Sequence, residues 1–366
     1  MAQAALTSFG AASPSISVFD TESTHRLSPN ASSNPLLANL SKREIPSLSG
    51  LRGVAALSVV LYHYMEGTKL SGSIPGPYAV TLFFQLSGLL ITWLLLKEME
   101  VRGRLDWKHF YWRRALRLFP VFYVVWIMCR LAGPFPGSLA TFFYMGDYYT
   151  ALTGHYSILT SAWSLGVEEK FYLLWPLLLA RIRRPQLIKV LSGVLLVEPA
   201  YRSILTLFGF RTYTWFAFDT HLDAIVLGCL IALLAKQGWR PPQWLFHPAT
   251  PLIALGLVFA LQNQSDIVTY LLAVILVSVI CRPAAALNSA VARCFGKISY
   301  SLYLCHVYTA NVIWPRLLVH VTHHFSLPLS LALQLAIAIG FASVLHFTIE
   351  RPFLRIKNAL KIGQNA

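Results

Sequence analysis

Two residues of this 366-residue chain, Arg52 and His63, combine a permanent cation with a titratable imidazole inside one apolar run. Arg52 and His63 are eleven positions apart, which at ~100° per residue makes three helical turns plus about 20°, so both side chains share one face, ~16 Å apart along the axis. We expect Arg52 near a membrane interface and His63 deep in the span. A titratable group inside a span is costly and usually faces an internal cavity. His63 is then either a general base or a histidine tied to a neighbouring helix by one hydrogen bond.

Three arginines open another apolar run: Arg113, Arg114 and Arg117. Arg113 and Arg114 lie four and three residues before Arg117, so on a helix the three guanidinium groups are expected to converge on one patch. Such a patch suits a polyphosphate, for example that of coenzyme A. The alternative is that the arginines are interfacial anchors in contact with lipid phosphates. Spacing alone leaves both interpretations open.

Adjacent carboxylates, Glu168 and Glu169, open a further apolar run. Ser164 before them is a plausible helix cap, and acidic side chains in a first turn favour the helix dipole, so capping explains part of the pattern. It does not explain why both carboxylates lie against an apolar run. In a later run Tyr303 and His306 are three residues apart, which places them on one side of a helix.

The elements that hold these residues are predicted to be transmembrane helices. The chain is 56% hydrophobic and 12% charged, against about 25% charged in soluble domains. Runs such as 78–96 reach the ~20 residues that a helix needs to cross a ~30 Å hydrocarbon core. We predict an all-α integral membrane bundle of about ten transmembrane helices with both termini cytosolic. The spans are 51–67, 79–97, 115–131, 164–181, 187–207, 219–236, 248–262, 266–281, 299–319 and 327–349.

The charge pattern sets the predicted orientation. The net charge is +15, and lysines and arginines cluster in every second loop, as the positive-inside rule requires of cytosolic loops. A nucleic-acid interface would be contiguous rather than alternating, so no nucleic-acid partner is predicted. The stretch 138–150 is apolar but short, and we expect an external or re-entrant element there.

Three segments are predicted: a flexible cytosolic tail over 1–44, a transmembrane domain over 45–353, and a short basic cytosolic tail over 354–366. The five cysteines have no paired spacing and are expected to be free, mostly buried thiols. The histidines at 320, 323 and 324 have no acidic or thiol ligand beside them, so we predict no metal site.

Taken together, these stretches resemble the membrane-bound acyltransferase family 3, which includes O-acetylases of bacterial surface polysaccharides. The matching pieces follow the family's order across residues 48–353, and the ordered set is specific although each piece alone is weak. They are Arg52 with His63, Phe83–Ile91, Arg113–Pro120, Trp163–Pro176, Gly296–His306 and Glu350-Arg351-Pro352.

The resemblance implies a ten-helix membrane fold, an acyl-CoA donor and O-acylation of a carbohydrate or, in some members, a macrolide-type metabolite. By position, His63 resembles the family's essential histidine, and Glu168 and Glu169 its acidic pair. Arg52, Arg114 and Arg117 resemble its arginines near the donor site, and we add Tyr303 and His306 to the donor-binding candidates. Two positions depart from the pattern: Lys170 replaces a glutamine, and His221 replaces an arginine before the Asp-Ala pair. Both are expected on the acceptor's side.

The predicted function is O-acyl transfer, with acetyl as the expected group, from cytosolic acyl-CoA to a carbohydrate or glycolipid acceptor on the extracytoplasmic side. Neutral His63 is the predicted general base, and an acyl-histidine intermediate is the competing mechanism. The alternatives are O-acylation of a small hydrophobic metabolite and a transporter or flippase, which would need paired halves that the sequence does not display. We expect a bacterial inner-membrane location in contact with membrane lipid, with a eukaryotic endomembrane as the alternative; a homo-oligomer is compatible with such a bundle.

Overall fold

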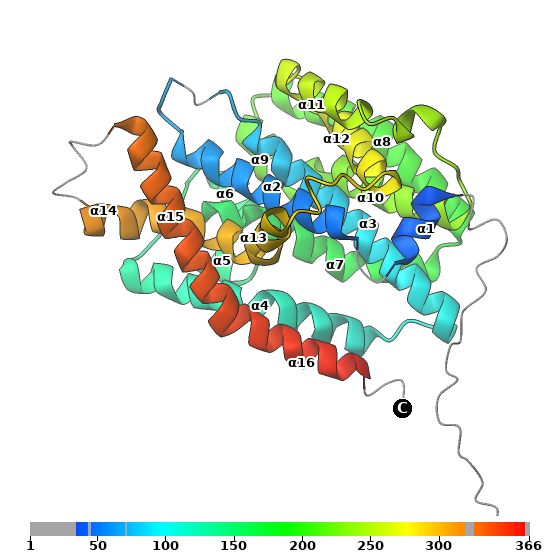
Figure 1. Ribbon diagram of the computed structural model, residues 1–366, viewed down its shortest axis with the longest axis horizontal. Coiled ribbons are helices and arrows are strands. Elements are labelled where there is room, and N and C mark those ends of the chain that lie inside the picture. The colour runs from blue at the N-terminus through cyan, green and yellow to red at the C-terminus, as the bar shows by residue number, and fades with distance from the viewer. Residues whose placement is uncertain (1–33, 43–44, 70–71, 319–325, 363–366) are drawn as a thin grey trace, which may run out of the picture.

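The computed structural model describes residues 34–42, 45–69, 72–318 and 326–362, and all structural statements below concern these residues. They form helices and no strand (Figure 1). The helices in chain order are α1 (Pro35–Ser41), α2 (Pro46–Tyr64), α3 (Gly76–Arg102), α4 (Trp107–Ala132), α5 (Ser138–Phe142), α6 (Gly146–Thr153), η1 (Thr160–Ala162), α7 (Trp163–Arg181), α8 (Arg184–Leu207), α9 (Arg211–Phe216), η2 (Phe218–Thr220), α10 (Leu222–Lys236), η3 (Gln243–Phe246), α11 (Thr250–Ala260), α12 (Ser265–Cys281), α13 (Ala290–Tyr308), η4 (Thr309–Ile313), α14 (Trp314–Leu318), α15 (Leu327–Leu345), η6 (His346–Glu350) and α16 (Arg351–Ile362).

The all-helical prediction is confirmed for the described residues, and each of the ten predicted ranges overlaps a helix. By length and composition, four helices within the described ranges are able to cross a membrane: Gly76–Arg102, Trp107–Ala132, Arg184–Leu207 and Leu327–Lys357. The ten crossings and the cytosolic termini remain predictions. The predicted external stretch 138–150 falls on α5 and α6, which at five and eight residues are too short to span a bilayer.

The two predicted tails are partly folded in the structure. Residues 34–42, inside the predicted flexible segment 1–44, carry α1, which packs on α12 through the buried Leu36 and Leu40. The Asn39 side chain donates to the carbonyl oxygen of Ile280 at 2.7 Å. The predicted basic tail 354–366 is, as far as Ile362, the helix α16. Leu36 and Leu40, four residues apart, lie on one face of α1. Packing of α1 on α12 accounts for a helix in a segment that the sequence predicted to be flexible.

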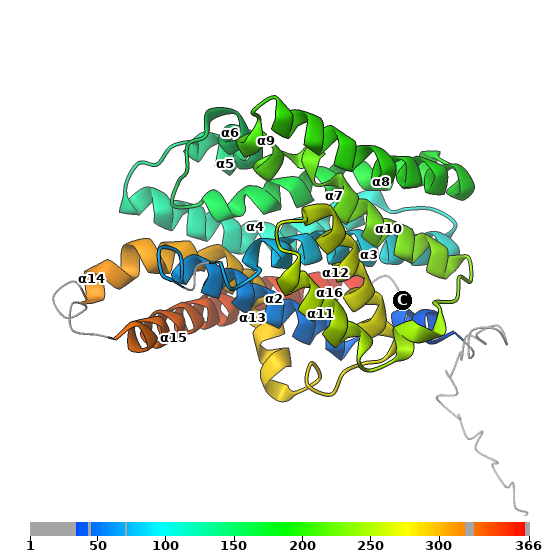
Figure 2. The same cartoon turned by 90° about the horizontal axis from the view of Figure 1, so that it is seen from above.

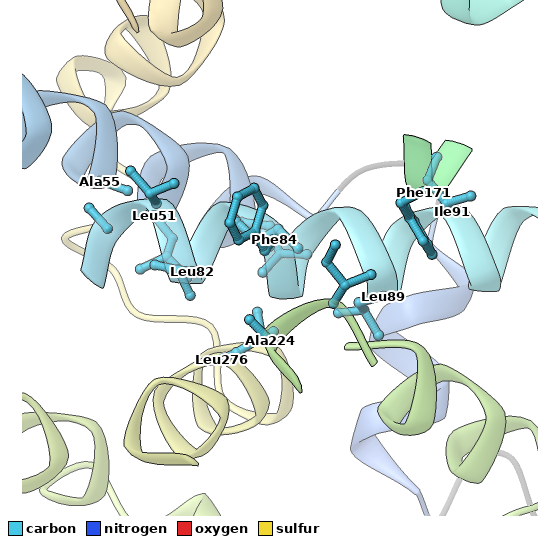
Figure 3. Close-up of a cluster of buried hydrophobic side chains, with 14 of the residues drawn as sticks. Leu51, Ala55, Leu82, Phe84, Leu89, Ile91, Phe171, Ala224 and Leu276 are labelled. Atoms are coloured by element: carbon cyan, nitrogen blue, oxygen red, sulfur yellow. The ribbon is translucent and has the colours of Figure 1, made fainter. Parts of the chain in front are cut away.

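Helix α3 lies at the centre of the bundle. In its most apolar window 72% of the residues are buried, against 11% in α8 and 11% in the helix formed by α15 and α16. Figure 3 shows its side chains Phe84, Leu89 and Ile91, each at most 1% exposed, among residues of α2, α7, α10 and α12. Helix α8 lies at one edge of the bundle and α11 at the opposite edge, with α3 between them (Figure 2).

Two helix pairs cross closely at glycines. A Cβ atom built on Gly53 of α2 would lie 2.7 Å from the backbone nitrogen of Gly296 in α13. One built on Gly228 of α10 would lie 2.1 Å from the carbonyl oxygen of Gln85 in α3. Small residues at such crossings let two backbones approach, as in transmembrane helix pairs generally. The first close approach lies in the N-terminal halves of α2 and α13. The two helices are also in contact near their C-terminal ends, at His63 and His306, and the candidate site lies there.

Candidate active site

His63 lies one residue before the end of α2, and its side chain opens into a cavity of about 1000 Å³. We call this space the His63 cavity; its wall includes Tyr62, Thr81, Phe84, Trp163, His221 and Tyr303. The imidazole is 37% exposed. The expectation that His63 faces an internal cavity is confirmed, and because α2 ends at Tyr64 the side chain lies at a helix end. Its depth in the membrane stays a prediction.

His306 of α13 is the nearest aromatic partner of His63 outside α2. The two ring centroids are 5.1 Å apart, with the planes inclined at 34°. His306 is fully buried, and its Nδ1 lies 2.6 Å from the carbonyl oxygen of Tyr303. Its Nε2 has no hydrogen-bond partner among the described residues.

Tyr303 joins α13 to the start of α7. Its hydroxyl donates to the carbonyl oxygen of Ser161 at 2.9 Å and lies 2.7 Å from the Ser164 hydroxyl. The sequence analysis grouped Tyr303 and His306 with the donor-binding arginines. In the structure Tyr303 lines the His63 cavity, and His306, one turn further along α13, lies against the His63 ring.

The opposite wall of the His63 cavity is aromatic. The His221 ring lies 4.9 Å from the Trp163 ring and 5.5 Å from the Phe84 ring, measured between centroids. Its Nε2 is 3.0 Å from the carbonyl oxygen of Trp215. His221 is therefore part of the cavity wall, and its expected place on the acceptor's side stays a prediction.

Lys170, the other departure, does not line the cavity. Its ammonium group donates to Asp147 at 2.7 Å and to the carbonyl oxygens of Tyr144 and Gly166 at 2.8 and 3.2 Å. Asp147 is fully buried in α6. The lysine thus fastens α6 to α7, which is a structural task that its position in the sequence did not suggest.

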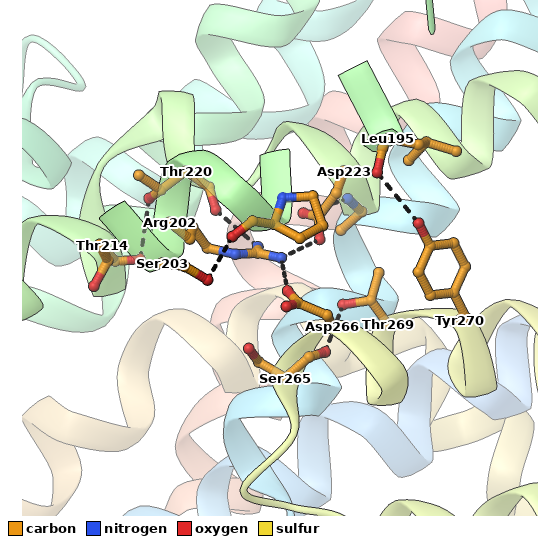
Figure 4. Close-up of polar contacts among 12 residues, drawn as sticks. Leu195, Arg202, Ser203, Thr214, Thr220, Asp223, Ser265, Asp266, Thr269 and Tyr270 are labelled. Carbon is orange, nitrogen blue, oxygen red and sulfur yellow. Dashed lines mark hydrogen bonds and ion pairs between the residues drawn. The ribbon is translucent and has the colours of Figure 1, made fainter. Parts of the chain in front are cut away.

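Arg202 of α8 anchors a polar network at the edge of the His63 cavity (Figure 4). Its Nη2 contacts Asp223 at 2.7 Å and also Asp266, and its Nη1 donates to the carbonyl oxygen of Thr220 at 3.1 Å. Arg202 is not among the site residues predicted from the sequence. The missed signal was an arginine and a carboxylate, Glu198, inside one apolar run, which marks a polar interior face.

Asp219 is held by three tyrosine hydroxyl groups. Tyr201 donates at 2.6 Å, Tyr148 at 2.9 Å and Tyr213 at 3.1 Å. Burial and then the Asp219 carboxylate raise the pKa of Tyr148 and of Tyr213, so both hydroxyl groups stay protonated and able to donate. These three hydrogen bonds to Asp219, which we call the Asp219 node, connect α6, α8 and α9 behind the wall of the His63 cavity.

Glu168 of α7 accepts hydrogen bonds from Ser87 at 2.9 Å and from Tyr172 at 2.7 Å. Glu169 beside it has a buried Oε1 without a partner among the described residues. Neither carboxylate is among the residues that line the His63 cavity. Both instead lie within electrostatic range of Arg114. The predicted acidic pair is therefore found near Arg114 and not in the wall of the His63 cavity.

Arg52, Arg114 and Arg117, which we call the arginine cluster, lie on α2 and α4. The charges of Arg117 and Glu168 act on Arg52, and the Arg114 guanidinium lies 4.6 Å from the centre of the Tyr172 ring. None of the three makes a hydrogen bond or an ion pair with the described part of the chain. These three guanidinium groups are therefore available to bind an anionic ligand.

Arg113 does not belong to the arginine cluster. Its guanidinium pairs with Glu98 of α3 at 3.3 Å. The expected convergence of Arg113, Arg114 and Arg117 is thus half right, because adjacent residues on a helix point about 100° apart. Within the described residues no group of three or more His, Cys, Asp or Glu side chains is arranged to hold a metal ion.

Glu350, Ser301 and His346 form a buried hydrogen-bonded triplet near Arg52 of the arginine cluster. Glu350 accepts hydrogen bonds from Ser301 at 2.7 Å and from Nδ1 of His346 at 2.9 Å. Its charge acts on Arg52. The π-helical turn His346–Glu350 joins α15 to α16 at this point, and such turns are frequent at functional sites.

Comparison with known proteins gives a consistent result. Residues 45–348 match the model of the family Acyl_transf_3, described as an acyltransferase domain. The chain is 28% identical over 310 residues to "Peptidoglycan O-acetyltransferase OatA" of Listeria monocytogenes, covering 73% of this chain and 49% of the relative. It is 30% identical over 309 residues to "Putative peptidoglycan O-acetyltransferase YrhL" of Bacillus subtilis, covering 72% and 48%. The chain thus spans about half the length of these relatives, and no solved structure matches it.

Proposed function

The chain belongs to the acyltransferase-3 family, and from that premise we propose that it is a membrane O-acetyltransferase that moves an acetyl group from acetyl-CoA to a carbohydrate hydroxyl. The observation that carries the proposal is the position of His63, an exposed imidazole in a large cavity, on the same helix as the unpaired Arg52. One helix thereby connects a candidate base to a candidate phosphate site.

The arginine cluster is the proposed donor site. Coenzyme A carries phosphate groups, and a guanidinium binds phosphate through two parallel charge-assisted hydrogen bonds. Arg114 and Arg117 on α4, with Arg52 on α2, offer three such groups without competing ion pairs among the described residues. Arg52 and His63 are eleven positions apart on α2, or ~16 Å along a helix. A donor bound in extended form at Arg52 therefore has room to bring its thioester toward His63. We place this site on the cytosolic side because the basic loops are predicted to lie there.

The His63 cavity is the proposed acceptor site, open to the extracytoplasmic side. Its aromatic wall at Trp163 and His221 and its polar edge at Arg202 and Asp266 combine the apolar lining and the few fixed polar groups that ligand sites use. The two named relatives carry peptidoglycan in their names, so we take a peptidoglycan glycan strand as the first acceptor to test.

His63 is the proposed general base. The acceptor hydroxyl attacks the thioester carbonyl, an O–C bond forms, and the C–S bond breaks. His63 removes the hydroxyl proton, which finally reaches the sulfur of coenzyme A. General-base assistance of this kind contributes ~10²–10⁴-fold.

The test is transfer of labelled acetyl from acetyl-CoA to soluble peptidoglycan fragments by the protein in proteoliposomes. We expect transfer by the wild type with donor and acceptor on opposite sides, and a loss of at least ~10²-fold in His63→Ala. Ser58→Ala, on the same helix but outside the wall of the cavity, is the matched control for folding. Full activity of a folded His63→Ala variant would refute the role of His63. A wild type that moves an intact glycan without acetylating it would favour a transporter.

A further inference from the structure

The ring of His306 is fixed in one tautomer. Its Nδ1 lies 2.6 Å from the carbonyl oxygen of Tyr303, and because a carbonyl oxygen only accepts, Nδ1 carries the hydrogen. In the neutral ring Nε2 is then a bare acceptor. That atom is buried and has no partner within the described residues.

The backbone around His306 is also held in place. Its carbonyl oxygen accepts hydrogen bonds from the hydroxyl groups of Tyr64 at 3.0 Å and Thr309 at 2.8 Å. Thr309 begins the π-helical turn Thr309–Ile313. A fully buried acceptor without a partner destabilises the fold, so an unpaired Nε2 on a side chain that is held in place calls for a functional reason.

The group next to this acceptor is His63. The two ring centroids are 5.1 Å apart, which is close enough for a rotation of the half-exposed His63 side chain to bring one of its nitrogens to Nε2. The other candidate partner of His63 is Glu66, whose carboxylate lies 3.9 Å from Nδ1 but is 73% exposed. An ion pair as exposed as that contributes little.

We propose that His306 is a positioning residue for the base: its Nε2 accepts a hydrogen bond from the imidazolium that forms when His63 takes the acceptor's proton. The inference rests on the proposed function. As the O–C bond forms, one imidazolium N–H faces the acceptor oxygen and the other donates to His306. After the C–S bond breaks, the proton passes to the coenzyme A sulfur and both rings return to their neutral state.

The experiment compares two substitutions of His306. In His306→Asn, the amide nitrogen takes the place of Nδ1 and keeps the bond to Tyr303, but no acceptor replaces Nε2. In His306→Gln, the amide oxygen reaches the place of Nε2. We expect kcat to fall ~10²-fold in His306→Asn and to recover about tenfold in His306→Gln, since general-base assistance is worth ~10²–10⁴-fold. The KM for acetyl-CoA and its calorimetric Kd should stay within about twofold, because His306 lies away from the arginine cluster.

Ser299→Ala is the matched control, because it removes a buried hydrogen bond within the same helix, to the carbonyl oxygen of Gly296, and does not involve His306. We expect a lower Tm and nearly wild-type kcat. Equal losses of kcat in Ser299→Ala and His306→Asn, or full activity of His306→Asn, would overturn the inference while leaving the proposed function intact if the wild type transfers acetyl. If His306→Asn does not fold, His306→Gln must exceed His306→Leu in kcat; equal rates overturn the inference. A wild type without transferase activity would remove both proposals.

Discussion

The polar edge of the His63 cavity and the arginine cluster differ in whether their guanidinium groups are paired within the protein. Both terminal nitrogens of Arg202 are engaged, with Asp223, Asp266 and a backbone carbonyl. The guanidinium groups of Arg114 and Arg117 have no hydrogen bond or ion pair among the described residues. Both regions lie between packed helices, so exposure to solvent does not explain the difference.

The difference identifies which charges hold the fold together and which are kept for a ligand. A charge removed from water is stable only when paired. Arg202 meets this requirement inside the protein. Arg114 has only the negative charges of Glu168 and Glu169 nearby, without a direct pair among the described residues. The phosphates of acetyl-CoA in the proposed donor site would supply a direct pair for Arg114 and for Arg117. The comparison therefore predicts binding defects at one region and folding defects at the other.

The largest effect is expected from the double variant Arg114→Ala with Arg117→Ala. A hydrogen bond to a charged group contributes ~1.5–3 kcal/mol, so losing two should weaken acetyl-CoA binding by at least ~10²-fold. Titration calorimetry of the purified protein measures the Kd, and wild-type binding should also weaken as salt is raised. The Tm should change little because no internal pair is broken. Unchanged affinity in the double variant would favour lipid anchoring as the role of these arginines.

The next effect is expected at the polar edge of the cavity. Arg202→Met leaves Asp223, which is 4% exposed, without its cation. Removing one partner of a buried pair costs ~3–5 kcal/mol, so the Tm should fall sharply while a folded fraction still binds acetyl-CoA. Adding Asp223→Asn should recover part of the loss. A Tm equal to that of the wild type would show that this pair is not part of the framework.

The sequence predicted the helices well because each has a long apolar run. It marked Arg52, His63 and Glu168 as candidates because charged groups in such runs are conspicuous, and their roles stay predictions. It did not predict which of them meet. The pairing of Arg113 with Glu98 depends on the approach of α3 and α4, and the contact of His63 with His306 depends on the glycine crossing of α2 and α13. Periodicity gives the face of one helix, and contacts between helices depend on packing that a single sequence does not contain.

A smaller effect is expected at Asp219. Asp219→Asn exchanges one carboxylate oxygen for an amide group that competes with the tyrosine hydroxyl groups as a donor, at a cost of ~1–3 kcal/mol. Tyr213→Phe removes a single donor and should cost about 1 kcal/mol. Because this node backs the cavity wall, we expect a higher KM for the acceptor and an unchanged Kd for acetyl-CoA. A change confined to acetyl-CoA binding would contradict the division between the two regions.

The smallest effect is expected from Arg113→Ala, and it tests the comparison most directly. Arg113 is a neighbour of Arg114 in sequence and carries the same charge, but its guanidinium already pairs with Glu98 at 3.3 Å. Such partly exposed pairs contribute up to ~1 kcal/mol, so the Tm should drop slightly and the Kd for acetyl-CoA should change less than about twofold. If Arg113→Ala instead weakened acetyl-CoA binding as much as Arg114→Ala, the number of positive charges on α4 would govern affinity. An arginine without an internal partner would then no longer indicate a ligand site, because a paired and an unpaired arginine would contribute equally to acetyl-CoA binding.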